Sequence, residues 1–302
     1  MIKLPSLHRL LPVLLLLILA AALGSLRPVA AQPGVIQVDP DCSLIEAIQA
    51  ANTDAAVGNC AAGSPGADTI VLTIDVLLTR AHTTTPEGSN GLPLITSDIT
   101  IRGAGFTIAR DGGANVQNFR LFQIAPDASL RLEYVVLRNG RLVGRNGGRG
   151  RNVSTPGAEG ETGEMGSVGF VVRGAGGPGG TGGNGRTGGT GGSGGSVAGG
   201  AIYNRGTLEL IDVTLENNTV QGGNGGVGGN ASRGGQGGIG GTPGVPIPLV
   251  IIAVLGPPGP GGRGGIGGTG GTGGSGGAAY GGAIYNDGGA VVIRTSTFAN
   301  NE

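Results

Sequence analysis

Tryptophan is absent from this chain of 302 residues, and aromatic residues make up only 3% of it. A large enzyme core rich in aromatic side chains is therefore not expected. An excess of charge of one sign is also lacking, because 19 Lys and Arg residues balance 19 Asp and Glu residues. The arginines are scattered, whereas binding along a nucleic acid backbone needs clustered cations. We expect no nucleic-acid partner.

Long apolar runs are scarce. Near the N-terminus, positively charged residues precede an apolar run, 10–23, and the small residues Val29-Ala30-Ala31 stand before Gln32. This pattern predicts a signal peptide, 1–31, and an extracellular or cell-surface location. The alternative is an uncleaved anchor, but the run is shorter than the ~20 residues that span a bilayer. A second run, 245–256, is shorter still and contains prolines, so we expect no transmembrane helix after signal cleavage.

Cysteine is limited to Cys42 and Cys60. An exported chain meets an oxidising compartment, so we predict that the two form a disulfide. Two unpaired thiols are the alternative. A zinc site is disfavoured because two thiols without nearby histidines supply only half of a tetrahedral ligand set. We predict neither a metal nor a cofactor.

Glycine, in contrast, is abundant, with 69 residues. When the glycine-rich stretches are set aside, three similar blocks of roughly 20 residues remain, and the last two open with "GGAIYN". A gapless alignment of the first two blocks places Ile124 on Ile202, Leu130 on Leu208 and Leu137 on Leu215, and the third block fits with one inserted residue. This is an internal repeat interrupted by insertions.

Apolar residues alternate within each block, as expected for short strands with one buried face. A single block cannot bury that face, but stacked blocks cover one another, which is the logic of a solenoid. Two earlier segments fit irregular turns of the same kind: 70–78, with apolar residues on one face, and 99–110, with two strands around a glycine turn. Asn139, Asn217 and Asn300 are predicted to stack as a buried amide ladder. The alternative is that they bind ligands or carry glycans.

One helix is predicted near the start, in "SLIEAIQAAN". Ser43 and Glu46 have the spacing of a capping box, and the apolar residues that follow form a stripe. An amphipathic helix at this position is expected to cover the open end of the stack.

The segment "CSLIEAIQAANTDAAVGNCAAGSPGADTIVL" resembles the N-terminal signature of bacterial exported proteins of the CSLREA type, although Ile45 replaces the usual arginine. The "GGAIYN" and "FANN" elements are similar to the GGAI and FxxN repeats of polymorphic outer membrane proteins. The resemblance implies a right-handed parallel β-helix of the pectin-lyase-like superfamily, and a surface or secreted protein, often an adhesin. It brings no catalytic residues. The chain stops at Glu302 within a repeat, which leads us to expect a fragment of a longer product.

The predicted fold is therefore all-β: a right-handed parallel β-helix solenoid with an N-terminal capping helix and long glycine-rich insertions. The expected segments are 1–31 (signal peptide), 32–140 (cap and first coils), 141–198 (insertion), 199–218 (coil), 219–280 (insertion) and 281–302 (coil).

Glycine recurs at every third residue in much of both insertions, for example from Gly176 to Gly194 and from Gly256 to Gly277. Three residues per turn is the period of polyproline II. We hypothesise that each insertion is a hairpin of two extended glycine helices and that the two hairpins exchange backbone hydrogen bonds, similar to polyglycine bundles of some phage tail-fibre tips and antifreeze proteins. A flexible coil is the alternative. Collagen is disfavoured, because only "GPPGPGG" has its composition.

Each insertion also carries an apolar hinge, which the hairpin hypothesis places at its tip as a partner contact. The hinge residues are Phe170, Val171 and Val172 in the first insertion and Leu249, Val250, Ile251 and Ile252 in the second.

No catalytic constellation is found: the carboxylates do not recur at matched repeat positions, and glycoside hydrolysis needs two that converge. We predict a surface protein without catalytic activity, an adhesin or envelope structural protein, with an unknown ligand such as a glycan or a protein of a host or neighbouring cell. One alternative is a carbohydrate-active β-helix enzyme, a lyase or hydrolase, whose active-site coils are missing from this chain. Another is a non-functional reading-frame remnant.

Overall fold

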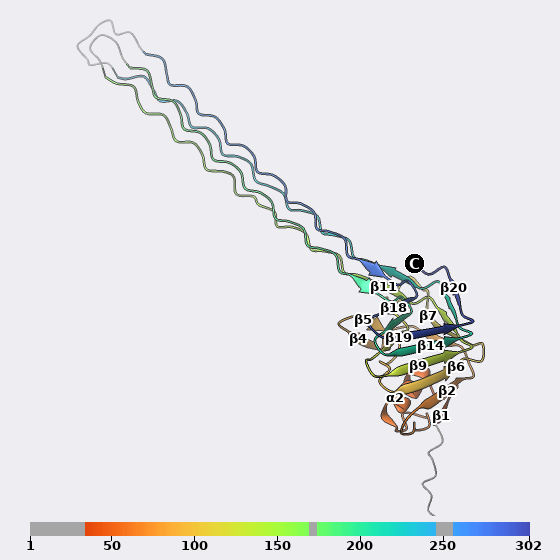
Figure 1. Ribbon diagram of the computed structural model, residues 1–302. Coiled ribbons are helices and arrows are strands. Elements are labelled where there is room, and N and C mark those ends of the chain that lie inside the picture. The colour runs from red at the N-terminus through yellow and green to blue at the C-terminus, as the bar shows by residue number, and fades with distance from the viewer. Residues whose placement is uncertain (1–33, 169–173, 246–255) are drawn as a thin grey trace, which may run out of the picture.

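A computed structural model of the chain describes residues 34–168, 174–245 and 256–302. Within these ranges the protein is mostly β, with a single helix and mainly parallel sheets. Figure 1 shows two parts: a body of stacked strands, and a long arm formed by the glycine-rich tracts. The arm leaves the body on the side of the later strands. The predicted signal peptide lies outside the described residues.

Three parallel sheets form most of the body. The largest has the order β1 (Val35–Val38), β2 (Asp68–Leu72), β6 (Asp98–Arg102), β9 (Ser129–Glu133), β14 (Thr207–Ile211) and β19 (Ala290–Arg294). The second has β3 (Val76–Leu78), β7 (Thr107–Arg110), β10 (Val136–Arg138), β15 (Thr214–Glu216) and β20 (Thr297–Ala299). The third has β8 (Phe122–Ile124), β13 (Ile202–Asn204) and β18 (Ile284–Asn286). In each sheet, spatial order follows chain order, so successive passes of the chain lie one on another.

Three smaller pairs lie near the base of the arm. Two are parallel: β11 (Arg141–Val143) with β16 (Thr219–Gln221), and β12 (Val197–Ala198) with β17 (Ala279–Tyr280). The third is the antiparallel hairpin of β4 (Thr83–Thr85) and β5 (Gly88–Asn90). The parallel pairs join the points at which the two insertions leave and re-enter the body.

The strand pairing confirms most of the repeat. Leu208 lies between Leu130 and Val291, as the alignment of the three blocks predicts. The position of Ile124 was predicted wrongly: it pairs with Asn204, and Phe122 pairs with Ile202. The turn between β8 and β9 is longer than the turn between β13 and β14 and contains a left-handed residue, Asp127. An alignment without gaps cannot accommodate a difference in turn length, so it assigned Ile124 the wrong partner.

The two earlier segments have different outcomes. Residues 99–110 form two strands, β6 and β7, around a glycine turn, as predicted. Residues 70–78 do not form one continuous extended face, because the chain bends after Leu72 and β3 joins the second sheet.

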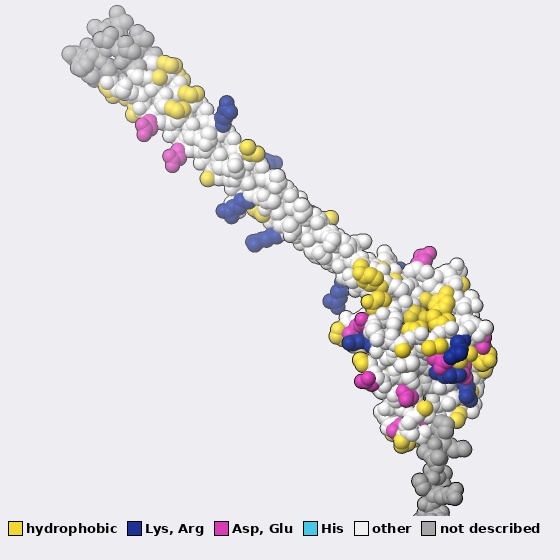
Figure 2. All heavy atoms as spheres, in the orientation of Figure 1, with side chains coloured by type: hydrophobic (Ala, Val, Ile, Leu, Met, Phe, Trp, Pro, Cys, Tyr) yellow, Lys and Arg dark blue, Asp and Glu magenta, His cyan; other side chains and the backbone are white. Residues whose placement is uncertain are grey.

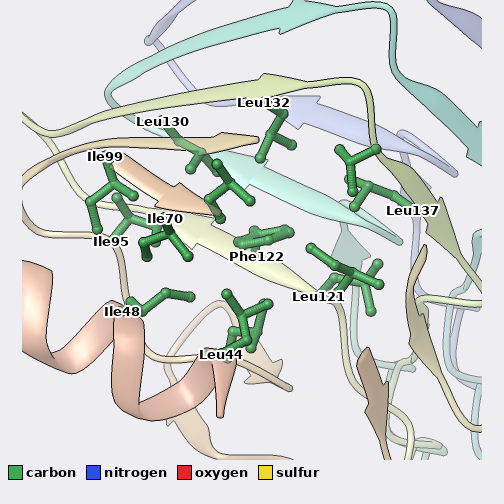
Figure 3. Packing of buried hydrophobic residues seen from close by; sticks show 14 of the residues in the cluster. Leu44, Ile48, Ile70, Ile95, Ile99, Leu121, Phe122, Leu130, Leu132 and Leu137 are labelled. Atoms are coloured by element: carbon green, nitrogen blue, oxygen red, sulfur yellow. The ribbon is translucent and has the colours of Figure 1, made fainter. Parts of the chain in front are cut away.

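The helix α2 (Leu44–Thr53) packs at the N-terminal end of the body. Its capping box is present: Ser43 Oγ accepts a hydrogen bond from the Glu46 backbone, and the Glu46 carboxylate accepts one from the Ser43 backbone. Figure 3 shows Leu44 and Ile48 pointing toward Ile70 and the other buried side chains of the sheets. The predicted disulfide between Cys42 and Cys60 is present beside the helix, where it ties the helix start to the following loop.

The buried amide ladder lies one residue after the predicted position. Asn139 is half-buried, Asn217 and Asn300 are exposed, and all three take left-handed backbone angles (φ 62°, 55° and 51°). Their neighbours form the ladder instead: the fully buried Asn218 donates from Nδ2 to Asn301 Oδ1 at 2.9 Å and accepts from the Gly140 backbone at 2.8 Å. The chain turns at Asn217, which takes left-handed backbone angles there, and the side chain of the next residue, Asn218, is buried.

The arm consists of four tracts that run side by side (Figure 1). They are the first (144–168), second (174–195), third (222–245) and fourth (256–277). Backbone hydrogen bonds of 2.7–2.8 Å join them, for example Gly147 N to Asn224 O, Gly192 N to Gly148 O, Gly226 N to Gly192 O, Gly191 N to Thr272 O and Gly274 N to Gly226 O. Within the described residues, the tracts therefore hydrogen-bond to one another as the bundle hypothesis predicts.

The place of each tract in the bundle decides at which positions it needs glycine. The second and third tracts hydrogen-bond to three tracts each, and they read mostly Gly-Gly-X. The first and fourth tracts hydrogen-bond to two tracts each, and only one glycine position per triplet is crowded there, although the fourth also reads mostly Gly-Gly-X. A Cβ at Gly274 would lie 1.9 Å from Gly192 O, whereas a Cβ at Gly273 would meet nothing closer than 3.5 Å. Close approach of neighbouring backbones therefore decides which glycines the arm needs.

One level of the arm departs from this pattern. Arg186 and Ser232 occupy places that glycine holds elsewhere in the second and third tracts, and Arg186 N donates to Ser232 Oγ at 2.7 Å. At the same level the first tract has one more residue between its hydrogen bonds, within Val153–Pro156. The hydrogen bond that the second tract donates to the first at the levels on either side is replaced here by the bond from Arg186 to Ser232.

Candidate functional site

Three of the four tyrosines of the chain meet at the base of the arm. Tyr203 comes from β13, Tyr285 from β18, and Tyr280 from β17, where the fourth tract re-enters the body. The Tyr203 and Tyr285 ring centroids are 5.5 Å apart, and those of Tyr280 and Tyr285 are 5.9 Å apart, each pair tilted by about 40°. Such tilted pairs have favourable aromatic geometry and leave part of each ring accessible.

The tyrosines line the first of two adjoining hollows. The first, of about 230 Å³, is also lined by Pro86, Glu87, Ser196, Val197 and Ala198. The second, of about 470 Å³, shares Pro86, Glu87, Ser196 and Val197 with it and continues between the β4–β5 hairpin and the arm. Its further lining includes Thr84, Thr85, Ser89, Asn118, Leu142 and Arg145. We call the two hollows together the base groove.

The exposure of the three rings falls from the rim inward. Tyr280 is 52% exposed, Tyr285 is half-buried and Tyr203 is 7% exposed. The hydroxyl of Tyr203 donates to Asp287 Oδ2 at 2.7 Å. Burial, together with this hydrogen bond and the nearby carboxylates, raises the pKa of Tyr203 to about 12. Tyr203 is therefore a neutral, buried side chain at the inner wall of the groove, and Tyr280 presents its ring to solvent at the rim.

The charges beside the groove are paired. Arg205 lies 3.7 Å from Glu87 and 3.6 Å from Asp287, measured between guanidinium nitrogen and carboxylate oxygen. Burial opposes the ionisation of Glu87, but hydrogen bonds from its own backbone, Thr85 and Gln123, with the charge of Arg205, outweigh burial and lower its pKa. Glu87 is thus an anion and a hydrogen-bond acceptor at neutral pH.

Arg120 supports the groove from behind. Its side chain is fully buried, its guanidinium lies 4.7 Å from the Tyr203 ring centroid, and Nη2 donates to the Glu87 carbonyl. Burial lowers the pKa of Arg120 to about 10, so it stays charged at neutral pH. Nε and Nη1 have no hydrogen-bond partner among the described residues. Arg120 therefore fixes both the hairpin and the inner tyrosine.

Sequence reasoning missed this site. It singled out "GGAIYN" as a repeat but assigned no role to the tyrosines within it. The available signal was their rarity, because three of only four tyrosines fall at or next to the two copies. The pairing of these copies, Tyr203 on Tyr285, follows directly from the repeat register.

The residues predicted as partner-contact tips cannot be placed. Phe170, Val171, Val172, Leu249, Val250, Ile251 and Ile252 lie outside the described residues. In the rest of the chain, as far as the structure describes it, no three His, Cys, Asp or Glu side chains converge as metal ligands would. None of the described helical segments is both long and apolar enough to span a bilayer.

Comparison with known proteins leaves the site without a precedent. No family model, no curated protein and no solved structure matches the chain. The resemblance to CSLREA-type proteins therefore remains a prediction.

Proposed function

We propose that the body is a right-handed parallel β-helix and that the protein is exported to the cell surface, where it binds a partner without catalysis. The fold proposal is supported by three parallel sheets whose strands all follow chain order. A stack of this kind is a rigid support on which long insertions can be carried without disturbing the core. An adhesin or envelope structural role follows from what this support presents.

The structure of the arm is the main observation in support of this proposal. Its backbone hydrogen bonds to itself over its described length, and Figure 2 shows an arm surface that consists mostly of backbone and uncharged polar groups, with scattered charged and hydrophobic side chains. With the ~3.1 Å rise of a three-residue helix, tracts of this length extend about 70 Å. Such a spacer holds whatever lies at its far end well away from the body, which is useful for contact and not for catalysis.

The charges of the base groove also favour binding over hydrolysis. Glycoside hydrolysis needs one carboxylic acid with a raised pKa to protonate the leaving group. The carboxylate that lines the groove, Glu87, has a lowered pKa instead. The alternative of a carbohydrate-active enzyme is tested by a depolymerisation assay on neutral and acidic polysaccharides. Activity that is abolished by a single carboxylate substitution would reject the proposed role.

Export is tested in a bacterial host that expresses residues 1–302. We expect a mature chain that begins at Gln32 and that external protease digests in intact cells. A chain that keeps its first 31 residues and is resistant until the cells are lysed would overturn the surface location. As a matched control, a variant without residues 1–31 is expected to stay inside the cells.

The role of the arm is tested by attachment of protein-coated beads to a panel of bacterial and animal cells. A short-arm variant lacks six matched residues from each tract: 147–152, 187–192, 224–229 and 269–274. A second variant lacks 245–255. We expect the native chain to attach, and the second variant to lose attachment while the short-arm variant retains part of it. Equal attachment by all three would contradict a role for the arm in contact.

A further inference from the structure

The base groove combines features that a small polar ligand would use, and no role has yet been assigned to it. Its walls are three tyrosine rings and apolar residues at one end, and hydroxyl, amide and backbone groups at the other. Ligand pockets typically have this mixture, with volumes of about 300–1,000 Å³. The two adjoining hollows, of about 230 and 470 Å³, fall in this range when taken together.

We propose that the base groove binds a neutral oligosaccharide, with one sugar ring against Tyr280 and Tyr285 and the following rings along the β4–β5 hairpin. The proposal rests on the proposed surface role and names the ligand class for a second contact point, at the base of the arm. The face of a tyrosine ring carries negative partial charge, and the C–H groups on the face of a pyranose carry positive partial charge. The polar rim then accepts and donates hydrogen bonds to the hydroxyl groups.

The balance of charge selects a neutral ligand. An aromatic cluster with nearby carboxylates is also the setting in which quaternary ammonium ions bind. Here that place is already filled by the protein, because the Arg120 guanidinium lies over the Tyr203 ring and Arg205 lies between Glu87 and Asp287. The side chains lining the groove that are charged at neutral pH are one carboxylate, Glu87, and one guanidinium, Arg145. Neither a cation nor an anion is therefore favoured.

The shape of the groove favours a chain over a single sugar. The first hollow holds the tyrosines, and the second continues from it past Glu87 between the hairpin and the arm. Threonine and serine hydroxyls (Thr84, Thr85, Ser89 and Ser196) and the Asn118 amide follow this path. Such groups exchange hydrogen bonds with sugar hydroxyls along an extended ligand.

The experiment is a titration of the purified chain followed by its intrinsic tyrosine fluorescence. The chain has no tryptophan, and three of its four tyrosines lie in the groove, so most of the emitting side chains belong to the site. The probes are hexasaccharides of β-1,4-glucose, α-1,4-glucose, β-1,4-mannose and β-1,4-N-acetylglucosamine, with hexagalacturonate as the anionic probe and tetramethylammonium as the cationic one. We expect at least one neutral hexasaccharide to change the emission and the two charged probes to have no effect.

The variants separate the ring face from the fold. Tyr280→Ala removes the most exposed ring and is expected to weaken binding about tenfold, whereas Tyr280→Phe keeps the ring and restores most of the affinity. Tyr280 is half-exposed on a short strand, so the fold is expected to survive. The matched control is Tyr134→Ala, at a similarly exposed tyrosine (57%) of the body outside the groove, which is expected to bind as the native chain does.

The inference is overturned if none of the neutral hexasaccharides binds, if a charged probe binds in their place, or if Tyr280→Ala binds as tightly as the native chain. These results are distinct from a failure of the proposed function. A purified chain that binds the saccharide but is retained inside cells would reject the surface role alone. An exported chain that binds none of the neutral probes would reject only the saccharide site.

Discussion

At the scale of single residues, two adjacent asparagines in the same repeat have opposite environments. Asn217 is exposed in a left-handed turn, and Asn218 is fully buried between Gly140 and Asn301. The side-chain amide of Asn218 accepts from the Gly140 backbone and donates to Leu137 O and Asn301 Oδ1, so it links three successive passes of the chain. A buried polar group without a partner costs free energy, and this makes the inner asparagine the sensitive one.

We predict that Asn218→Ala lowers the free energy of unfolding by about 2–3 kcal/mol, because it leaves the Gly140 N–H without its acceptor and removes the hydrogen bonds that the Asn218 side chain donates to Leu137 O and Asn301 Oδ1. The measurement is urea unfolding followed by far-UV circular dichroism. Asn217→Gly is the matched control, and it should change stability by less than about 0.5 kcal/mol because glycine accepts the left-handed turn. Equal effects at both positions would mean that the buried ladder is misassigned.

A second residue-scale prediction concerns Glu133, which accepts hydrogen bonds from Arg102 and Arg131 on the largest sheet. Burial opposes the ionisation of Glu133, but these hydrogen bonds and charges outweigh burial and lower its pKa from 4.5. A carboxylate with a lowered pKa stabilises the fold above the unfolded pKa, and this stabilisation is lost as the pH falls through the folded one.

Glu133→Gln should therefore lower stability by about 1 kcal/mol at pH 7 and make the decline in stability below about pH 5 shallower than in the native chain. Urea midpoints between pH 3 and pH 7 measure both effects. Glu161→Gln, on the exposed surface of the arm, serves as the control and should follow the native profile. A native profile that is flat across this range would contradict the assignment.

At the scale of the elements, the arm depends on close backbone approach more than on side-chain packing. Glycine loses more conformational freedom than any other residue when it is ordered. The arm offsets this cost with hydrogen bonds between tracts, and these require backbones so close that a Cβ at Gly226 would lie 2.0 Å from Gly148 O. The sequence therefore keeps glycine at the crowded positions and admits larger residues at the outward ones.

Gly274→Ala is predicted to separate the fourth tract from the second and third, with loss of the Gly274–Gly226 hydrogen bond and its neighbours. Gly273→Ala should be tolerated, since its Cβ would make only an ordinary van der Waals contact, 3.5 Å from Gly226 O. Amide hydrogen exchange of the arm measures the difference, and protection should fall in the first variant alone. Identical exchange in both variants would show that the crowded position was assigned to the wrong glycine.

At the scale of the whole molecule, the body and the arm are held together by different interactions. The body buries one continuous cluster of apolar side chains between its sheets and the capping helix. The described part of the arm contributes no residue to this cluster, and its tracts are joined by repeated backbone hydrogen bonds. The result is an elongated molecule, with the base groove at the junction of its two parts.

Small-angle X-ray scattering should reveal this shape. A compact chain of this length has a radius of gyration of about 19 Å, and an arm of about 70 Å should raise the measured value well above that. The short-arm variant, which lacks six residues per tract, should have a maximum dimension smaller by about 19 Å. A native value close to that of a compact chain would show that the arm folds back onto the body.

Local sequence patterns determine much of the structure of this molecule. The capping box at Ser43 and Glu46, the alternation around Leu208 and Leu210, and the glycine triplets depend on neighbouring residues or fixed periods, and all three led to correct predictions. The disulfide was also predicted correctly, because a chain with two cysteines allows only one pairing. Two predictions were wrong: which asparagine of each repeat is buried, and which residue pairs with Ile124. Both depend on the geometry of the turns, which the alternation of apolar and polar residues does not encode.

The base groove was decided by the tertiary structure alone. Glu87, Tyr203 and Arg145 are far apart in the sequence, and they meet only because the turn of the β4–β5 hairpin, a body sheet and the start of the arm converge at one level of the stack. The same holds for the division of the tracts into inner and outer ones, which determines how many glycines each triplet needs. Sequence periodicity determines which residues share a face, but the contacts between separate passes of the chain follow from how those passes pack.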